Sequence, residues 1–501
     1  MSVNLVRNSA FNFVTQGFVL VLTFVCTPIV VSGLSTEKFG LLTLIWSFVG
    51  YFALLDLGIS RASTKFVAES IKLNNHNSTK ALVWTSITIN IITGFVGMIL
   101  ILSTTSYLVN TVFHIAPNLQ AMARNTFIVA ACGIPFMLVF GTVRGFQMAY
   151  QRFDLVNTFQ LIIALVQWGG SITLIWMGYG LLEVVYVTVG IRVLCSILSF
   201  IMMSRLRTDI FKKVILFDRV EFKKLVSFGG WVTISQIISP LFLYLDRAMI
   251  GMFSTLTAVS FYSVPQEAMA RMLVIPMSLT TTLFPALSEH AVSQQSDGKS
   301  EELYLRSLKY FFILMLPVAL IFIVNAEFLL KLWVGAEFAK QSSLVFQILT
   351  VGMFLNVLGQ IPATALHAYG RPDLTAKFHA FELVLMIGLN VILIPRFGIV
   401  GAAITWTVRL VVDSVLLFLT AHKYVGKTFS MIQSHVNMKG VFVQTILIAL
   451  ACTGLLMVEN IPVKIIVTCI VCLVFSAGTW FYGIDSYDKK FLLSIPSKIL
   501  K

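Results

Sequence analysis

The chain has 501 residues, of which 57% are hydrophobic and only 12% are charged, whereas soluble domains average about 25% charged residues. A soluble globule could not cover this much apolar surface, so the composition excludes an ordinary soluble protein and indicates lipid as the solvent. The formal net charge is +14, but the basic residues fall in short gaps between apolar runs, which is typical of a membrane protein rather than of a nucleic-acid-binding domain.

The predicted elements are membrane-spanning helices. A span needs about 20 mostly apolar residues, and backbone groups in lipid must bond within their own segment. The strands of a β-barrel would instead alternate in polarity over about ten residues. In chain order, the fourteen expected spans are 9–34, 39–58, 81–103, 125–148, 156–178, 181–203, 225–250, 259–288, 308–332, 343–367, 377–394, 400–420, 440–458 and 464–482.

Lysine and arginine predict the orientation of these spans. With the amino terminus inside, the gaps on the cytoplasmic side hold twenty-five basic residues and those on the opposite side hold five. This asymmetry predicts that both termini are cytoplasmic, and it supports an even number of spans because losing or gaining one would scramble the pattern.

The chain also contains signs of an internal repeat. "AYQRFDL" at 149–155 returns as "AYGRPDL" at 368–374, an offset of 219 residues. Ser35-Thr36 and Ser254-Thr255 share that offset, and residues 180–194 run parallel to residues 398–412 at an offset of 218. A common offset at three places predicts the duplication of six helices, with a pseudo-twofold axis along the membrane normal.

The expected fold class is therefore an all-α polytopic membrane protein in which two six-helix lobes surround a central cavity. The predicted regions are an N-terminal lobe (1–208), a basic cytoplasmic linker (209–224), a C-terminal lobe (225–425) and two additional helices with a cytoplasmic tail (426–501). Two such lobes are the architecture of an alternating-access carrier. The gaps between spans are too short for a soluble domain and lack a phosphate-binding glycine-rich loop, so we expect no enzyme, cofactor or metal site.

Charged residues inside spans are the candidate site residues, because each costs about 2.5–3.5 kcal/mol to insert. The candidates for substrate binding are Arg192, Arg247, Arg271 and Arg409, and those for ion coupling are Asp246, Glu267 and Asp413. Glu267 and Arg271, like Arg409 and Asp413, are spaced i, i+4 and should share a helix face. The fork of arginine suits phosphate oxygens, which predicts an anionic substrate. The alternative interpretation is that these charges neutralise one another or snorkel to the interface. That alternative is favoured for Arg144, Asp56 and Glu183, and Glu382 is a further acid inside a span.

Three stretches resemble a known family: "LLDLGIS" at the end of the second span, "YLDRAMIGMFSTLTAVSFYSVPQ" across the seventh and eighth, and "TTTLFPALSE" at the end of the eighth. They are similar to the polysaccharide flippases, which include O-antigen and capsule repeat-unit flippases, of the multidrug/oligosaccharidyl-lipid/polysaccharide exporter superfamily. The resemblance covers about twelve spans. It implies a protein of the bacterial inner membrane that moves an undecaprenyl-pyrophosphate-linked oligosaccharide to the outer leaflet, coupled to an ion gradient, with polysaccharide polymerase machinery as a possible partner.

Several alternatives remain open from the sequence. A cation-coupled multidrug antiporter of the same superfamily would need an essential buried acid, and the first span offers only Asn12, Thr15 and Gln16. A lipid II flippase would differ in its substrate and genetic context. A glycan polymerase or ligase would need a large outer loop with arginine and histidine, and His114 is the only histidine in the outer gaps.

Overall fold

A computed structural model of the chain describes residues 3–52, 56, 58–113, 115–211, 217–273, 299–425 and 460–483, together with the single positions 283, 287, 454, 455 and 458. For residues 3–14, 52, 227–240, 243, 271, 299–300, 425 and 482–483 it describes the backbone alone. The chain divides into two compact units, Met1–Ser263 (unit 1) and Val264–Lys501 (unit 2). The predicted lobe boundaries stay a prediction, as does the pseudo-twofold relation between the lobes.

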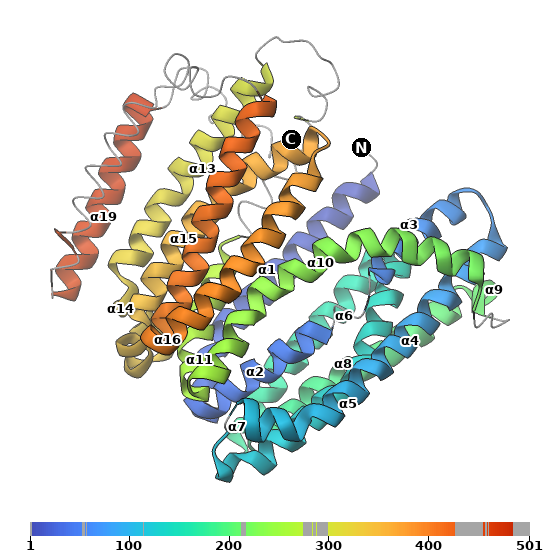
Figure 1. Cartoon of the computed structure of the whole chain (residues 1–501). Coiled ribbons are helices and arrows are strands. Elements are labelled where there is room, and N and C mark those ends of the chain that lie inside the picture. Colours follow the sequence, from blue (N-terminus) through green and yellow to red (C-terminus); the bar gives the residue numbers. More distant parts are fainter. Residues whose placement is uncertain are drawn as a thin grey trace. The chain divides into compact units, whose positions relative to one another are not determined.

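Unit 1 is a set of long helices joined by short turns (Figure 1). They are α1 (Val3–Leu34), α2 (Thr36–Phe52), α3 (Ile59–Lys72), α4 (His76–Tyr107), α5 (Pro117–Ala149), α6 (Phe153–Leu165), α7 (Ser171–Trp176), α8 (Leu181–Leu206), α9 (Thr208–Phe211), α10 (Arg219–Phe253) and the first part of α11 (Leu256–Arg271); π-helical turns η2 (Leu108–Val112) and η3 (Val166–Gly170) follow α4 and α6. Helices α4, α5 and α8 pack side by side, and α2 packs against α5, α8 and α10.

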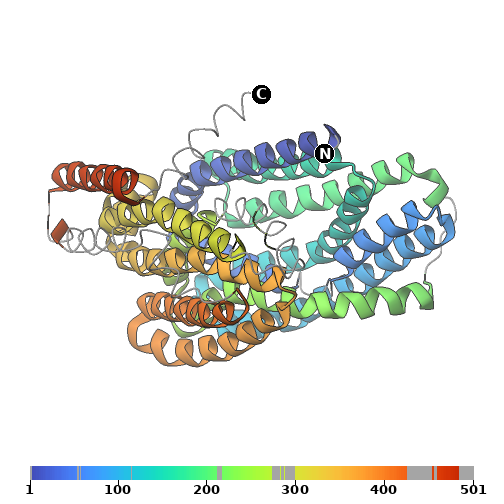
Figure 2. The same ribbon diagram turned by 90° about the horizontal axis from the view of Figure 1, so that it is seen from above.

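Unit 2 contains the rest of α11, α13 (Lys299–Val324), α14 (Ala326–Val334), α15 (Ala336–Ala368), α16 (Pro372–Val425), α19 (Ile461–Gly478) and the π-helical turn η4 (Thr479–Gly483). Helix α15 packs between α13 and α16, and α19 packs against α13 (Figure 2). Helix α16 holds two of the predicted spans, which meet at a kink at Gly398 with φ 56° and ψ −134°. We call these parts the first half (372–397) and the second half (399–425) of α16.

The helical fold confirms the all-α polytopic prediction. Nine helices among the described residues are long and apolar enough to cross a membrane, and many of their outward side chains are apolar, such as Ile92 and Ile99 of α4. Such faces fit a lipid solvent. The predicted span 440–458 falls mostly on residues outside the described part. The gap after the second span contains an unpredicted helix, α3, whose buried face includes Ile59, Phe66 and Val67.

The repeated heptapeptides form the same turn in the two units. Helices α5 and α15 each have 33 residues and are offset by 219. After α5, the Arg152 N–H donates to Gln147 O at 2.8 Å, and after α15 the Arg371 N–H donates to Leu366 O at the same distance. The residue before each arginine has a left-handed φ, 58° at Gln151 and 72° at Gly370.

The side chains of this turn also match. Arg152 Nε donates to Asp154 Oδ1 at 2.9 Å, and Arg371 Nε donates to Asp373 Oδ1 at 3.0 Å. Hydrogen bonding to the aspartate in each copy raises the pKa of Arg152 and of Arg371 above the usual value. The sequence repeat is thus also a geometric repeat, which supports the predicted duplication.

Candidate functional site

Arg192, in the middle of α8, is held by groups that carry no charge. Its Nη2 donates to Gln167 Oε1 at 2.8 Å, and its guanidinium carbon lies 4.9 Å from the centroid of the Trp46 ring. Gln167 belongs to η3, and π-helical turns within α-helices are often found at functional sites. The described residues include no carboxylate within ion-pair distance of Arg192. Within the described part of the chain, the half-buried guanidinium therefore has no compensating negative charge.

Arg247 and Asp246, neighbours on α10, are both buried, with exposed fractions of 4% and 0%. The Tyr262 hydroxyl of α11 donates to Asp246 Oδ2 at 2.6 Å. The close approach of α11 to α2 depends on Gly40, because a Cβ there would lie 1.8 Å from Leu256 O. A small residue in α2 thus lets the α10–α11 corner pack closely in unit 1.

Aromatic side chains connect these two arginines. The Tyr51 and Tyr244 rings meet edge to face with centroids 5.9 Å apart. Tyr244 lies close enough to Arg192, and Tyr51 close enough to Arg247, for each to interact with the charge of that arginine. We call the set Trp46, Tyr51, Gln167, Arg192, Tyr244 and Arg247 the arginine–aromatic strip.

The strip combines cations, hydrogen-bonding groups and flat rings. Its buried Tyr51 hydroxyl has no hydrogen-bond partner among the described residues. Arginine can pair with phosphate or carboxylate oxygens, and tyrosine and tryptophan offer an apolar face with a polar tip. Because Arg192 is half-buried and Arg247 is buried, Arg192 is the better placed of the two for direct contact with an anion.

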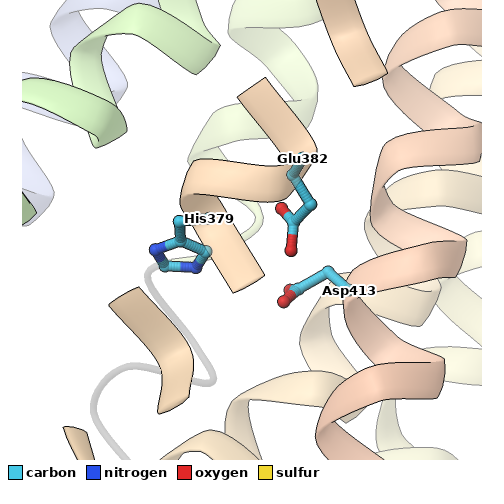
Figure 3. A group of neighbouring side chains, drawn as sticks. All are labelled: His379, Glu382 and Asp413. Atoms are coloured by element: carbon cyan, nitrogen blue, oxygen red, sulfur yellow. The ribbon is translucent and has the colours of Figure 1, made fainter. Parts of the chain in front are cut away.

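Arg409 of unit 2 has a different environment. Its Nη1 donates to Glu382 Oε2 at 3.1 Å, in an ion pair whose side chains are 8% and 0% exposed. Asp413 lies on the same half of α16, as its spacing from Arg409 predicted, and is 6% exposed. His379 completes the group, since its imidazole and the Glu382 and Asp413 carboxylates place one nitrogen or oxygen each within 4.8 Å of one another (Figure 3). We call these four residues the α16 cluster.

The other two candidates are described less fully. Glu267 lies half-buried on α11, and Arg271 is the last residue of that helix. The side chain of Arg271 is outside the described part of the chain, so the predicted pairing of Glu267 with Arg271 stays a prediction. The substrate-binding and ion-coupling roles assigned from the sequence are likewise predictions.

Some residues of these two sites were not among the sequence candidates. Glu382 is an acid inside an apolar run of the sequence. Its pairing with Arg409, 27 residues later, depends on how the two halves of α16 pack against each other. No motif or helical spacing in the sequence marks the other five residues, which are Trp46, Tyr51, Gln167, Tyr244 and His379.

The comparison with known families is decisive for the class of protein. Residues 5–291, more than half of the chain, match the family described as "Polysaccharide biosynthesis protein". The chain belongs to the polysaccharide biosynthesis protein family. Residues 270–473 also match the family "Lipid II flippase MurJ". The resemblance predicted from the sequence motifs is thereby confirmed.

Relatives and solved structures agree with this family. The chain is 27% identical over 414 residues to the "Putative O-antigen transporter" of Shigella flexneri, which covers 83% of the chain and 97% of the relative. The fold is similar to that of the lipid II flippase MurJ in an inward closed conformation, with a TM-score of 0.72, 13% identity, and 94% and 98% of the two chains covered. It is also similar to an inward-facing multidrug resistance MATE family transporter, with a TM-score of 0.72, 15% identity, and 81% and 95% covered.

Proposed function

We propose that this member of the polysaccharide biosynthesis protein family is a flippase that moves an anionic polyprenyl-pyrophosphate-linked oligosaccharide from the cytoplasmic to the outer leaflet by alternating access. The observation that carries this proposal is the arginine–aromatic strip, in which the partners that the described residues offer Arg192 at hydrogen-bond and ring-contact distance are neutral. The relatives named as an O-antigen transporter and as flippases support the class of substrate.

In this mechanism, Arg192 attracts the pyrophosphate or an acidic sugar while the polyprenyl chain stays in lipid. Arg247 adds positive potential from within unit 1, and the rings of Trp46 and Tyr244 present flat faces to the glycan. A substrate that binds one state of the carrier more tightly shifts the population toward that state. The binding energy of the substrate thus favours the transition between the inward and outward states. An ion gradient makes net transport run from the cytoplasmic to the outer leaflet.

The experiment is a flipping assay with purified protein in vesicles containing a polyprenyl-pyrophosphate oligosaccharide. Arg192→Gln should lower kcat/KM about tenfold or more, because a charge-assisted hydrogen bond contributes about 1.5–3 kcal/mol. Arg152→Gln is the matched control, since Arg152 lies in the turn after α5, where it pairs with Asp154. Equal rates for wild type and Arg192→Gln would reject the strip as the binding site.

A lipid II flippase is the second candidate, favoured by the match of residues 270–473. The same vesicles loaded with lipid II distinguish the two, because the preferred head group will be flipped with the higher kcat/KM. A cationic-drug antiporter fits less well, since the strip carries positive charge.

The proposed location is the bacterial inner membrane with both termini cytoplasmic, where polysaccharide polymerase machinery would receive the flipped product. Single cysteines added at the two termini should react with a membrane-impermeant maleimide in inverted vesicles and stay unreactive in intact cells. Labelling in intact cells would contradict this orientation.

A further inference from the structure

The α16 cluster is a charged site that the fold itself does not require. In the first repeat, residues 219 positions earlier than His379 and Glu382 are Gln160 and Ile163 of α6. For offsets of 218–220, the counterparts of Arg409 are 189–191 and those of Asp413 are 193–195, all of them uncharged. The aligned helices α6 and α8 therefore form without the two carboxylates and the imidazole, and the nearest arginine is Arg192, at an offset of 217. Helix packing alone does not account for the acids of the cluster.

The buried charges of the cluster do not balance. Glu382 and Asp413 supply two carboxylates, and Arg409 supplies one guanidinium. Glu382 Oε1 and Asp413 Oδ1 are buried and have no hydrogen-bond partner among the described residues, and the two carboxylates face each other between the halves of α16 (Figure 3). Two neighbouring carboxylates in a buried site cannot both stay ionised without compensation, so the site as the described residues form it is one positive charge short.

We propose that the α16 cluster binds one exchangeable proton, held between Glu382 Oε1 and Asp413 Oδ1 and delivered through His379. On loading, an O–H bond forms on one carboxylate and this hydroxyl donates to the other carboxylate, while His379 returns to its neutral form. On release, the proton passes to His379 and then to water, and Arg409 faces two ionised carboxylates. The binding of the proton stands independently of substrate, whereas its coupling to transport rests on the proposed flippase function.

A proton fits this environment better than a metal ion. With neutral His379, one proton brings the net charge of the cluster to zero, whereas a divalent ion would leave it positive beside Arg409. Hard monovalent and divalent cations also prefer shells of oxygen ligands, and here an imidazole and a guanidinium take part. From the neighbouring helix α15, the titratable side chain of His367 lies close enough to His379 for their charges to interact. The His367 ring hydrogen-bonds the Thr375 hydroxyl at 3.0 Å.

His379 is placed to connect the cluster to water. It is half-buried and lies one helical turn closer than Glu382 to the turn at 369–371, where Gly370 is exposed. Imidazole exchanges protons near neutral pH, which suits a relay. On the first half of α16, the other titratable groups toward this turn are Lys377 and Asp373, which pair with each other at 3.8 Å, so His379 is the titratable group next to Glu382 on this path.

Binding of the proton should also change the packing of the two halves of α16. Glu382 is on the first half of α16 and Asp413 on the second, and Gly398 joins the halves at a left-handed φ of 56°. The shared proton attracts the two carboxylates to each other, and its loss makes them repel. Loading and release should therefore change how the two halves pack, which is the differential interaction that a coupled transition needs.

The binding of the proton is tested by infrared difference spectroscopy of the full chain in lipid nanodiscs during a pH titration. Wild type should show a protonated-carboxyl band that disappears as pH rises, and both Glu382→Gln and Asp413→Asn should lack it. Asp56→Asn is the matched control and should keep the band, because the Asp56 carboxylate accepts hydrogen bonds from Asn90 and Ser60. The Glu382→Gln/Asp413→Asn double variant, whose amides can pair, controls for folding.

Three results would overturn the site. They are a band that survives both single substitutions, a band lost equally in Asp56→Asn, and removal of the wild-type band at fixed pH by added sodium or zinc chloride. The last result would assign the cluster to a metal ion. His379→Gln should slow proton exchange without removing the band, and an unchanged exchange rate would remove the relay from the proposal.

Coupling is tested separately in the vesicle flipping assay with an imposed pH gradient. The gradient should raise the flipping rate of wild type. In Glu382→Gln this rise should be about tenfold smaller, which is in the range of usual coupling free energies. The same gradient response in Glu382→Gln and wild type would overturn the coupling role. Absence of flipping by wild type, with the infrared band intact, would reject the flippase function and leave the proton site standing.

Discussion

Arg192 lies in α8 and Arg409 in the second half of α16, which correspond to each other in the predicted duplication, yet their surroundings are opposite. Arg192 contacts an amide and an indole ring and is half-buried. Arg409 is buried against Glu382, with Asp413 on the next turn of its helix. A cation with neutral partners can attract an external anion, whereas a cation buried among acids responds to their protonation. The same residue type is thus held in two different environments in the two units.

The largest expected effect comes from removing the cation of the α16 cluster. Arg409→Met should destabilise the protein by about 3–5 kcal/mol, because it leaves two buried carboxylates uncompensated. Thermal unfolding in detergent at neutral pH measures this loss, and lowering the pH should restore part of it because the acids take up protons. Arg192→Met, which leaves no acid behind, is the control. Equal stability of the two variants would contradict the contrast between the arginines.

The repeated turn gives a second comparison with a smaller effect. Gly370→Ala places a Cβ at a φ of 72° and should cost about 1–2 kcal/mol. Gln151→Gly, at the matching position, relieves the same strain and should stabilise the folded state by less than about 1 kcal/mol. Thermal unfolding of both variants checks the opposite signs, and two changes of the same sign would show that the turns are not equivalent.

A substitution of Trp46 tests whether its ring positions Arg192 for binding the substrate. Trp46→Leu removes a cation–π contact worth about 0.5–1 kcal/mol, so the apparent affinity for substrate should fall about two- to fivefold. Substrate titration in the flipping assay measures this change. Trp176→Leu is the control, since Trp176 is 78% exposed at the end of α7, and a loss as large there would remove the special role of Trp46.

The smallest expected change in stability comes from making the second repeat resemble the first. Replacing the buried charges together, as Glu382→Ile/Arg409→Met/Asp413→Leu, should leave stability within about 1 kcal/mol of wild type or raise it, because apolar replacements of whole buried ion clusters are often tolerated. The response of flipping to a pH gradient should disappear. A loss of stability as large as that of Arg409→Met would show that the cluster holds the two halves of α16 together.

The sequence predicted what depends on local patterns. Apolar length gave the helices, and the shared offset identified the repeated turn before its hydrogen bonds were known. The pairing of Arg409 with Glu382 could not be predicted, because it requires knowing how two neighbouring helices are rotated, and spacing indicated only Asp413. Tyr51 and Tyr244 were missed for the same reason, since α2 and α10 are far apart in sequence. The π-helical turn at Gln167 left no recognisable signal.

Gly398 is the single residue that joins the two halves of α16, so the halves are two arms that share one pivot. Glu382 is sixteen residues before the joint and Asp413 fifteen residues after it, so at 1.5 Å per residue each carboxylate lies about 22–24 Å from the pivot. Opening the arms by about 5° at that radius separates their tips by about 2 Å, which is enough to break a hydrogen bond. A tilt too slight to disturb the packing of either arm would still make or break the contact at the far end.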